Sequence, residues 1–224
     1  MRQVLDYASA APPRAQYDAG AIRRLFALDL AHHCFAVRPH EWAKFYEPQI
    51  TRGFVHYLTE GGADRQLGRA LAFYRAACRC AGRRIVQAGA DRIKDFEVAA
   101  EEATTMKRGA GRKRIERGKI DILVDFELDD GVRAGAALEA KFDHTLSRGQ
   151  LGKYAAHLID KRQWSYERSP LILVGRYTTP PDDGRWDSTN WWRFMLWFER
   201  ELAEPDDDPE FQRFRRTLWE TAYA

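Results

Sequence analysis

Every second residue from Ile120 to Phe126 is apolar, and the positions between them and after them hold Asp121, Leu123, Asp125 and Glu127. This period of two is typical of a strand with one buried face. The triplet Asp129-Asp130-Gly131 follows and predicts a hairpin turn. The partner strand is predicted to run from about Ala134 to Phe142. In that strand one face carries Leu138, Ala140 and Phe142, and the other face carries Glu139 and Lys141.

Apolar residues at helical spacing mark most of the remaining chain. They predict helices over residues 22–33, 50–58, 67–78, 150–158, 191–202 and about 209–221. Glycines at 61, 62 and 82 are expected to end the second and third of these helices. Residues 96–105 are predicted to be extended, 171–174 to be a buried strand, and 106–119 and 180–184 to be loops.

The order of these elements predicts an α/β protein with three layers, in which helices flank a mixed central sheet of about four strands. A chain of 224 residues fits one large domain. We expect residues 1–90 to form a helical region that packs on the core and residues 91–180 to form the core itself. Residues 181–224 are expected to add aromatic helices to the same domain.

Composition narrows the class of protein without naming a partner. Lys and Arg number 36 against 33 Asp and Glu, so a net charge of +3 does not by itself indicate a polyanion. The chain has no apolar run of about 20 residues and no signal-like start, so we expect a cytoplasmic protein without a membrane span. The three cysteines, Cys34, Cys78 and Cys80, are expected to be free thiols rather than a disulfide framework.

Two carboxylates and one ammonium fall on the neighbouring predicted strands. Adjacent strands lie about 4.8 Å apart, so in a suitable register Asp121 and Glu139 would face one small volume. Mg²⁺ prefers oxygen ligands, and one or two carboxylates with phosphate oxygens and waters form its usual shell. Lys141 would then hold the attacking water or the phosphate. Singly, each is an ordinary polar residue of a half-exposed strand, and only the joint pattern favours a site.

This ordered set resembles the PD-(D/E)XK nuclease superfamily over about residues 96–176. Asp121 matches the first acidic position, and Glu139-Ala140-Lys141 matches the (D/E)XK tripeptide. Gln150 and Tyr154 resemble the Gln-x-x-x-Tyr helix motif of the RecB-like branch. The resemblance implies a restriction-endonuclease-like core that hydrolyses phosphodiesters with Mg²⁺ or Mn²⁺. One departure is that no proline precedes Asp121.

The resemblance also implies roles for helical residues. Gln150 and Tyr154 lie one turn apart, where they would sit beside the metal and help to place nucleic acid. The alternative for Tyr154 is a core aromatic with a satisfied hydroxyl. Many members bring a glutamate from an early helix to the metal, and here Glu47 is the candidate, with Glu41 and Glu60 as rivals. A favourable charge at a helix N-terminus is the alternative for Glu47.

Two further groups of charged residues border the predicted site. Asp125 shares a strand face with Asp121, and we favour a solvated side chain over an extension of the acidic site. The loop before the first strand is rich in glycine and basic residues, and we expect it to contact phosphates. A solvated loop is the alternative. Its basic residues are Lys107, Arg108, Arg112, Lys113, Arg114, Arg117 and Lys119.

Three functions remain open at this point. The first is a metal-dependent nuclease, expected to act on DNA in defence against foreign DNA, such as phage DNA, or in repair. The second is a non-catalytic nucleic-acid-binding module of the same fold. The third is an interaction subunit that forms a homo-oligomer or binds a partner protein through the aromatic helix at 191–202, although a core position for that helix is equally expected.

Overall fold

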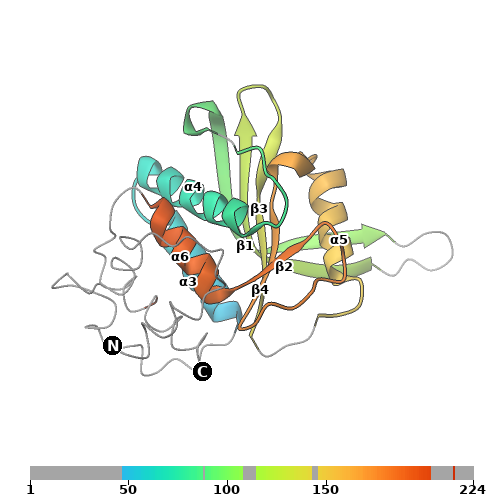
Figure 1. The fold of residues 1–224 in the computed structure, drawn as a ribbon. Coiled ribbons are helices and arrows are strands. Elements are labelled where there is room, and N and C mark those ends of the chain that lie inside the picture. The colour runs from blue at the N-terminus through green and yellow to red at the C-terminus, as the bar shows by residue number, and fades with distance from the viewer. Residues whose placement is uncertain (1–46, 88, 108–114, 143–145, 203–213, 215–224) are drawn as a thin grey trace, which may run out of the picture.

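The computed structural model describes residues 47–87, 89–107, 115–142, 146–202 and 214, which form an α/β protein around a five-stranded mixed sheet (Figure 1). The helices predicted over 22–33 and about 209–221 lie outside these ranges, except for Phe214. No described helix combines the length and the apolar character that a membrane crossing needs.

The sheet is antiparallel on one side and parallel on the other. β1 (Ile93–Lys107), β2 (Ile115–Leu128) and β3 (Arg133–Lys141) pair antiparallel in that order. β4 (Leu171–Gly175) and β5 (Asp187–Asn190) then add in parallel beyond β3. The predicted turn between β2 and β3 is confirmed, because Gly131 has a φ of 75° and its N–H donates to the Leu128 carbonyl.

Two predictions about the sheet need correction. The loop predicted over 106–119 is shorter, because β1 and β2 continue pairing as far as Lys107 and Ile115. The sheet has five strands rather than about four, and the additional strand is β5. β5 is a short polar strand, Asp187-Ser188-Thr189-Asn190, that pairs with β4 at the sheet edge. Its sequence has no apolar alternation, so pairing rather than side-chain pattern makes it a strand.

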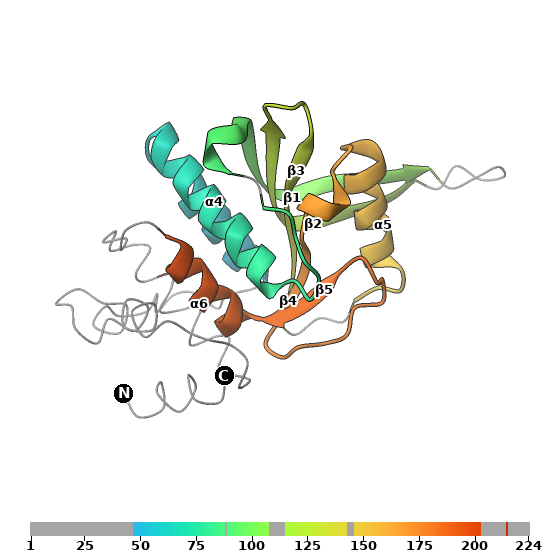
Figure 2. The same cartoon turned by 45° about the horizontal axis from the view of Figure 1, so that its top comes forward.

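Three helices cover one face of the sheet. They are α3 (Glu47–Thr59), α4 (Ala63–Cys80) and α6 (Trp191–Glu201), and Figure 2 shows α4 and α6 on the same side. Phe54 of α3 packs against Phe73 and Phe198, with ring centroids 5.6 and 5.1 Å apart. Cys78 and Cys80 are buried free thiols, as expected, and burial raises the pKa of each to about 12.

The aromatic face of α6 is part of this core. Trp191, Phe194 and Phe198 are fully buried within the chain. The helix begins at Asn190, whose side chain accepts a hydrogen bond from the Arg193 N–H at 3.0 Å. The core alternative for this helix is therefore confirmed, and its most apolar face is covered within the chain.

The opposite face of the sheet carries a smaller cluster under α5 (Gln150–Ala156) and the π-helical turn η2 (His157–Lys161). Leu151, Tyr154 and Leu158 pack there against Leu123, Leu173 and Trp164. Helices thus lie on both faces of a mixed sheet, as the three-layer prediction required. Short 3₁₀ turns, η1 (Ala90–Arg92) and η3 (Tyr166–Arg168), complete the described elements.

Candidate active site

β2 and β3 separate beside Asp121. The β2–β3 ladder ends at the pair Ile122–Leu138, although β2 goes on pairing with β1 and β3 goes on pairing with β4 as far as Gly175. Figure 1 shows the far end of the β1–β2 hairpin projecting away from β3. Asp121 is the first residue beyond the ladder, and its Oδ2 accepts a hydrogen bond from the Ala140 N–H at 2.8 Å. The carboxylate is thus fixed at the point where the strands diverge.

Glu139 and Lys141 lie beside this point on the α5 side of the sheet. Glu139 is 1% exposed, so its carboxyl group is almost completely removed from water. Lys141 Nζ lies 2.7 Å from Glu139 Oε1 and also donates to the Ala140 carbonyl at 2.8 Å. The alternation seen in the sequence therefore places both side chains away from the main core, as predicted.

Glu47 joins Asp121, Glu139 and Lys141 from α3, and these residues form one charged group. Its Oε1 accepts from Lys141 Nζ at 3.0 Å, and its Oε2 accepts from the Phe142 N–H at 3.1 Å. Of the two rivals, Glu60 is exposed beyond the other end of α3, and Glu41 lies outside the described residues. Glu47 is therefore the early glutamate that the fold brings to Lys141.

Gln150 and Tyr154 join the group from α5. Gln150 Nε2 donates to Glu139 Oε1 at 2.6 Å and to the Tyr154 hydroxyl at 3.0 Å. The same hydroxyl accepts from the Lys119 N–H at 3.2 Å, which links α5 to β2. Tyr154 is only 4% exposed, so it corresponds to the core alternative, and its contact with nucleic acid stays a prediction.

Gly118 allows this link between α5 and β2. A Cβ at this position would lie 2.6 Å from Cε1 of Tyr154 and 2.9 Å from Oγ1 of Thr104. Neither neighbour leaves room for a methyl group, so the close approach of the Tyr154 ring to the strand requires glycine. The sequence motif Gly118-Lys119-Ile120-Asp121 thus contains a packing requirement that its spacing alone did not reveal.

Negative charge dominates the electrostatics of the buried charged group formed by Glu47, Asp121, Glu139 and Lys141. Burial raises the pKa of Glu139, the nearby charge of Asp121 raises it further, and the ion pair with Lys141 only partly opposes the rise. Burial likewise raises the pKa of Asp121, against the hydrogen bond from Ala140 and the charge of Lys141. Burial alone would lower the pKa of Lys141, but Glu139, Glu47 and Asp121 outweigh it and the pKa is raised.

Asp125 corrects a prediction. It is 1% exposed rather than solvated, although it lies on the same strand as Asp121. Its Oδ2 accepts from Arg133 at 2.6 Å and from Arg162 at 2.7 Å, and Arg162 also binds Glu102 at 2.7 Å. Arg162 lies 37 residues away in sequence, at the end of η2, so only the fold could supply this partner.

Glu101 was not predicted and holds two cations near the separation of the strands. It lies on β1 between residues that pair with Ile122 and Ile120, and its φ of 53° is unusual for a residue with a side chain. Its Oε2 accepts from Arg52 at 2.8 Å and from Lys119 at 2.9 Å, and these partners lower its pKa. No signal in the sequence distinguishes Glu101 from its neighbours Glu97 and Glu102.

Most of the predicted basic loop lies outside the described residues. Lys119 is described, and its ammonium binds Glu101. The backbone of Lys107 and Arg117 belongs to β1 and β2, and nothing is described of their side chains. Arg108, Arg112, Lys113 and Arg114 lie outside the described residues. The expected phosphate contacts of this loop therefore stay a prediction.

Metal-ligating side chains can be assessed over the described part of the chain. There, no group of three or more His, Cys, Asp or Glu side chains is arranged to hold a metal ion. The ammonium of Lys141 lies between Glu47 and Glu139, so these two carboxylates do not face one another freely. Asp121 and Glu139 remain as a smaller pair of neighbouring carboxylates.

Comparison with known proteins identified no relative of this chain. The chain matches no protein-family model, no curated protein and no solved structure. The functional assignment therefore depends on the geometry of Glu47, Asp121, Glu139, Lys141 and Gln150.

Proposed function

We propose that this chain is a metal-dependent nuclease of the PD-(D/E)XK type, with a restriction-endonuclease-like core, that hydrolyses phosphodiester bonds in DNA with Mg²⁺ or Mn²⁺. The observation that carries the proposal is the convergence of residues from separate segments on one hydrogen-bonded group. α3 supplies Glu47, β2 supplies Asp121, β3 supplies Glu139 and Lys141, and α5 supplies Gln150. Asp121, Glu139, Lys141 and Gln150 belong to the ordered set that resembles the superfamily's motifs, and Glu47 is the candidate among the early glutamates.

The residues fit a divalent cation in two respects. Glu139 Oε2 is buried and has no hydrogen-bond partner among the described residues, which is costly unless another group satisfies it. The group also holds three carboxylates against one ammonium, and burial raises the pKa of Asp121 and Glu139. Asp121 and Glu139 would bind the ion, and phosphate oxygens and waters would complete its shell. Bound there, the ion would lower the pKa of a water molecule and stabilise charge on the phosphate.

The chain's own residues prepare the site for an anionic substrate. All three N–H groups of Lys141 have acceptors, namely Glu47, Glu139 and the Ala140 carbonyl. If Glu139 turns its charge toward a cation, one N–H of Lys141 becomes available for a phosphate oxygen or the attacking water. Glu47 keeps the ammonium in place, and Gln150 keeps the Glu139 carboxyl in place. The ammonium then offsets the negative charge that grows on the phosphate.

The proposal extends to substrate and biological role. DNA as the substrate follows from the resemblance, and so does a role in defence against foreign DNA or in repair. The basic residues of the 107–119 segment would supply sequence-independent, salt-sensitive phosphate contacts. Lys119 of β2 would add to these contacts if its ammonium leaves Glu101.

Cleavage assays test the proposal directly. Supercoiled plasmid and single-stranded DNA are incubated with the purified protein and Mg²⁺ or Mn²⁺, beside Asp121→Ala and Lys141→Ala prepared in the same way. We expect cleavage by the wild type that EDTA abolishes and that both variants lose. Equal cleavage by both variants would assign the activity to another site or to a contaminant and would contradict the proposal.

A second candidate function has one observation in its favour. Because Lys141 is saturated by its three acceptors, the group could serve as an internal ion-pair network in a non-catalytic nucleic-acid-binding module. This alternative predicts salt-sensitive DNA binding without cleavage. It also predicts a melting temperature that Mn²⁺ does not change, whereas the nuclease proposal requires Mn²⁺ to raise it in the wild type and not in Asp121→Ala.

A further inference from the structure

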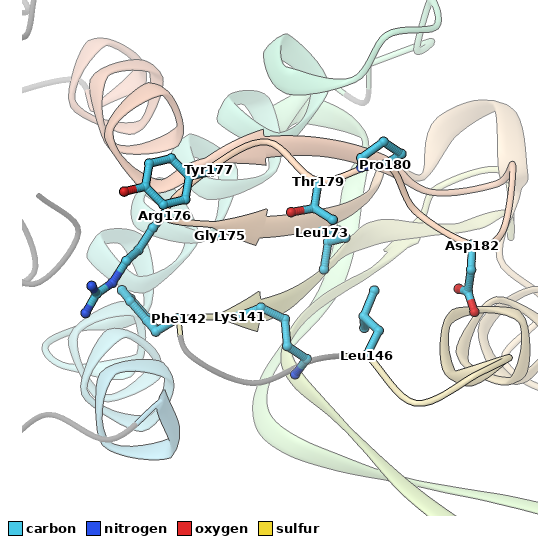
Figure 3. Close-up of a pocket in the computed structure, with 10 residues that line it drawn as sticks. All are labelled: Lys141, Phe142, Leu146, Leu173, Gly175, Arg176, Tyr177, Thr179, Pro180 and Asp182. Carbon is cyan, nitrogen blue, oxygen red and sulfur yellow. The ribbon is translucent and has the colours of Figure 1, made fainter. Parts of the chain in front are cut away.

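A pocket of about 390 Å³ opens beside Lys141, at the carboxyl ends of the parallel strands β3 and β4 (Figure 3). Ligand pockets of proteins span about 300–1,000 Å³, so this one suits a single small group. In open sheets, the region beyond the carboxyl ends of parallel strands is a common place for ligands. The side chain of Lys141 belongs to both the pocket and the candidate active site. The residues that line the pocket include Lys141, Phe142, Leu146, Leu173, Arg176, Tyr177, Thr179 and Asp182.

Two aromatic rings border the pocket, and they differ in how they are held. Phe142 stacks on Trp191, with centroids 5.3 Å apart and planes 13° apart, so its position is fixed by the core. Tyr177 is 79% exposed, which is unusual for a large aromatic residue in the described part of the chain. An exposed tyrosine at the rim of a pocket offers a flat surface on which another ring can stack.

The backbone holds Tyr177 close to β3. A Cβ at Gly175 would lie 3.0 Å from the Tyr177 carbonyl oxygen and 3.1 Å from the Lys141 carbonyl oxygen. Both neighbours are backbone atoms, which cannot move as a flexible side chain can. Gly175 thus permits the chain to turn tightly after β4 and to place Tyr177 at the rim.

Charges around the pocket suit a nucleotide. Lys141 and Arg176 provide two cations among the lining residues, and Figure 3 shows Arg176 near Phe142. In Figure 3, Asp182 lies at the opposite end of the pocket from Arg176, with Lys141 between them. Asp182 accepts a hydrogen bond from the Gly149 N–H at 2.8 Å, directly before Gln150. A phosphate would favour Lys141 and Arg176, and an aromatic base would favour the rings of Phe142 and Tyr177.

We propose that this pocket holds the base of one unpaired nucleotide that flanks the scissile phosphate. This inference rests on the proposed nuclease function and names its substrate class as DNA with an unpaired strand. A base inside an intact duplex is stacked and paired, so it would enter the pocket only after leaving the helix. A base of a single strand enters without that cost. Stacking on Tyr177 and Phe142 is worth about 1–3 kcal/mol per base and requires no particular sequence.

Binding without metal tests the pocket independently of cleavage. A short fluorescein-labelled single strand and its blunt duplex are titrated in EDTA with the wild type, Tyr177→Ala, Tyr177→Phe and the control Val86→Ala. Val86 is also an exposed apolar residue, at 51%, and it does not line the pocket. We expect Tyr177→Ala to weaken single-strand binding by about tenfold or more. Duplex binding should change less than twofold, and Tyr177→Phe and Val86→Ala should resemble the wild type.

Failure of this inference can be separated from failure of the nuclease proposal. Equal effects of Tyr177→Ala on the single strand and the duplex, or no effect on either, would overturn the pocket assignment even if the protein cleaves DNA. Selective loss of single-strand binding would support the pocket even if no cleavage is found. Photocrosslinking with a strand that carries 5-iododeoxyuridine gives a second readout, and we expect adducts on Tyr177 or Phe142. Adducts only elsewhere would contradict the proposal.

Discussion

Asp121 and Asp125 lie four residues apart on β2, yet their surroundings differ in how charge is balanced. Asp125 meets two guanidinium groups, from Arg133 and Arg162, and Arg162 continues to Glu97 and Glu102. Asp121 meets Glu139 and Glu47 with the single ammonium of Lys141 among them. The first group is nearly neutralised by the chain itself. The second keeps an excess of negative charge in a buried place, which a divalent cation or bound protons can balance.

This difference teaches that burial of an acidic residue does not by itself indicate chemistry. Asp125 is more deeply buried than Asp121, but its partners match its charge. The raised pKa values of Asp121 and Glu139 mark the group whose charges are unmatched. Perturbed pKa values of this kind are common at functional sites.

The largest expected effect concerns cleavage by variants of the two aspartates. Asp121→Asn should lower kcat by about 10²–10³-fold, because it removes charge where the proposed metal and the phosphate would be held. Asp125→Asn should change kcat by less than about threefold, because its partners are structural. Rates are measured with saturating DNA and Mg²⁺ at a temperature where both variants are folded. Equal losses in the two variants would remove the functional distinction between the two groups.

Loss of stability should be larger for the Asp125 variant than for the Asp121 variant, the opposite of the order expected for kcat. Asp125→Ala leaves the half-buried guanidinium of Arg162 without one partner, and we expect the free energy of unfolding to fall by about 3 kcal/mol. Loss of the ion pair with Arg133 contributes less to this fall, because the Arg133 side chain is 42% exposed and water screens its charge. Asp121→Ala should change the metal-free stability by less than about 1 kcal/mol, because burial already disfavours its charge. Urea denaturation of both variants measures this, and a larger loss in Asp121→Ala would contradict the comparison.

A third expected effect is a dependence of stability on pH and metal. Because the pKa values of Asp121 and Glu139 are raised, the folded protein binds more protons than the unfolded chain above the ordinary carboxyl pKa of about 4. The free energy of unfolding in EDTA should therefore fall as the pH rises from about 4 through the raised pKa values. Mg²⁺ at one hundred times its Kd should add about 2.7 kcal/mol at the upper end of this range.

Glu139→Gln is the matched variant for this prediction. It cannot ionise, so its stability should depend less steeply on pH in EDTA than that of the wild type. It should also gain little stability from Mg²⁺. Thermal or urea denaturation over a pH series measures both effects, and a parallel pH profile in the variant would show that Glu139 is not the titrating group.

Local pattern determined much of the fold and of the candidate site. The alternation from Ile120 to Glu127 set the face of β2, and Asp129-Asp130-Gly131 set the turn, because both depend on neighbours along the chain. The spacing of Glu139 and Lys141 placed both on one face of β3, and the resemblance to the PD-(D/E)XK superfamily implied that Gln150 joins them. The same local reasoning missed β5, because four polar residues become a strand only through pairing with β4.

Tertiary structure alone decided which of the two aspartates, Asp121 or Asp125, has its charge balanced by neighbouring cations. Asp121 and Asp125 look alike in the sequence, since each stands between apolar residues of one strand. Arg162 reaches Asp125 across 37 residues, and Glu47 reaches Lys141 across 94 residues. The separation of β2 from β3 beyond Ile122, and the pocket beside Lys141, likewise depend on how distant segments pack. Charge balance in a folded protein is set by neighbours in space, and a linear pattern records only neighbours along the chain.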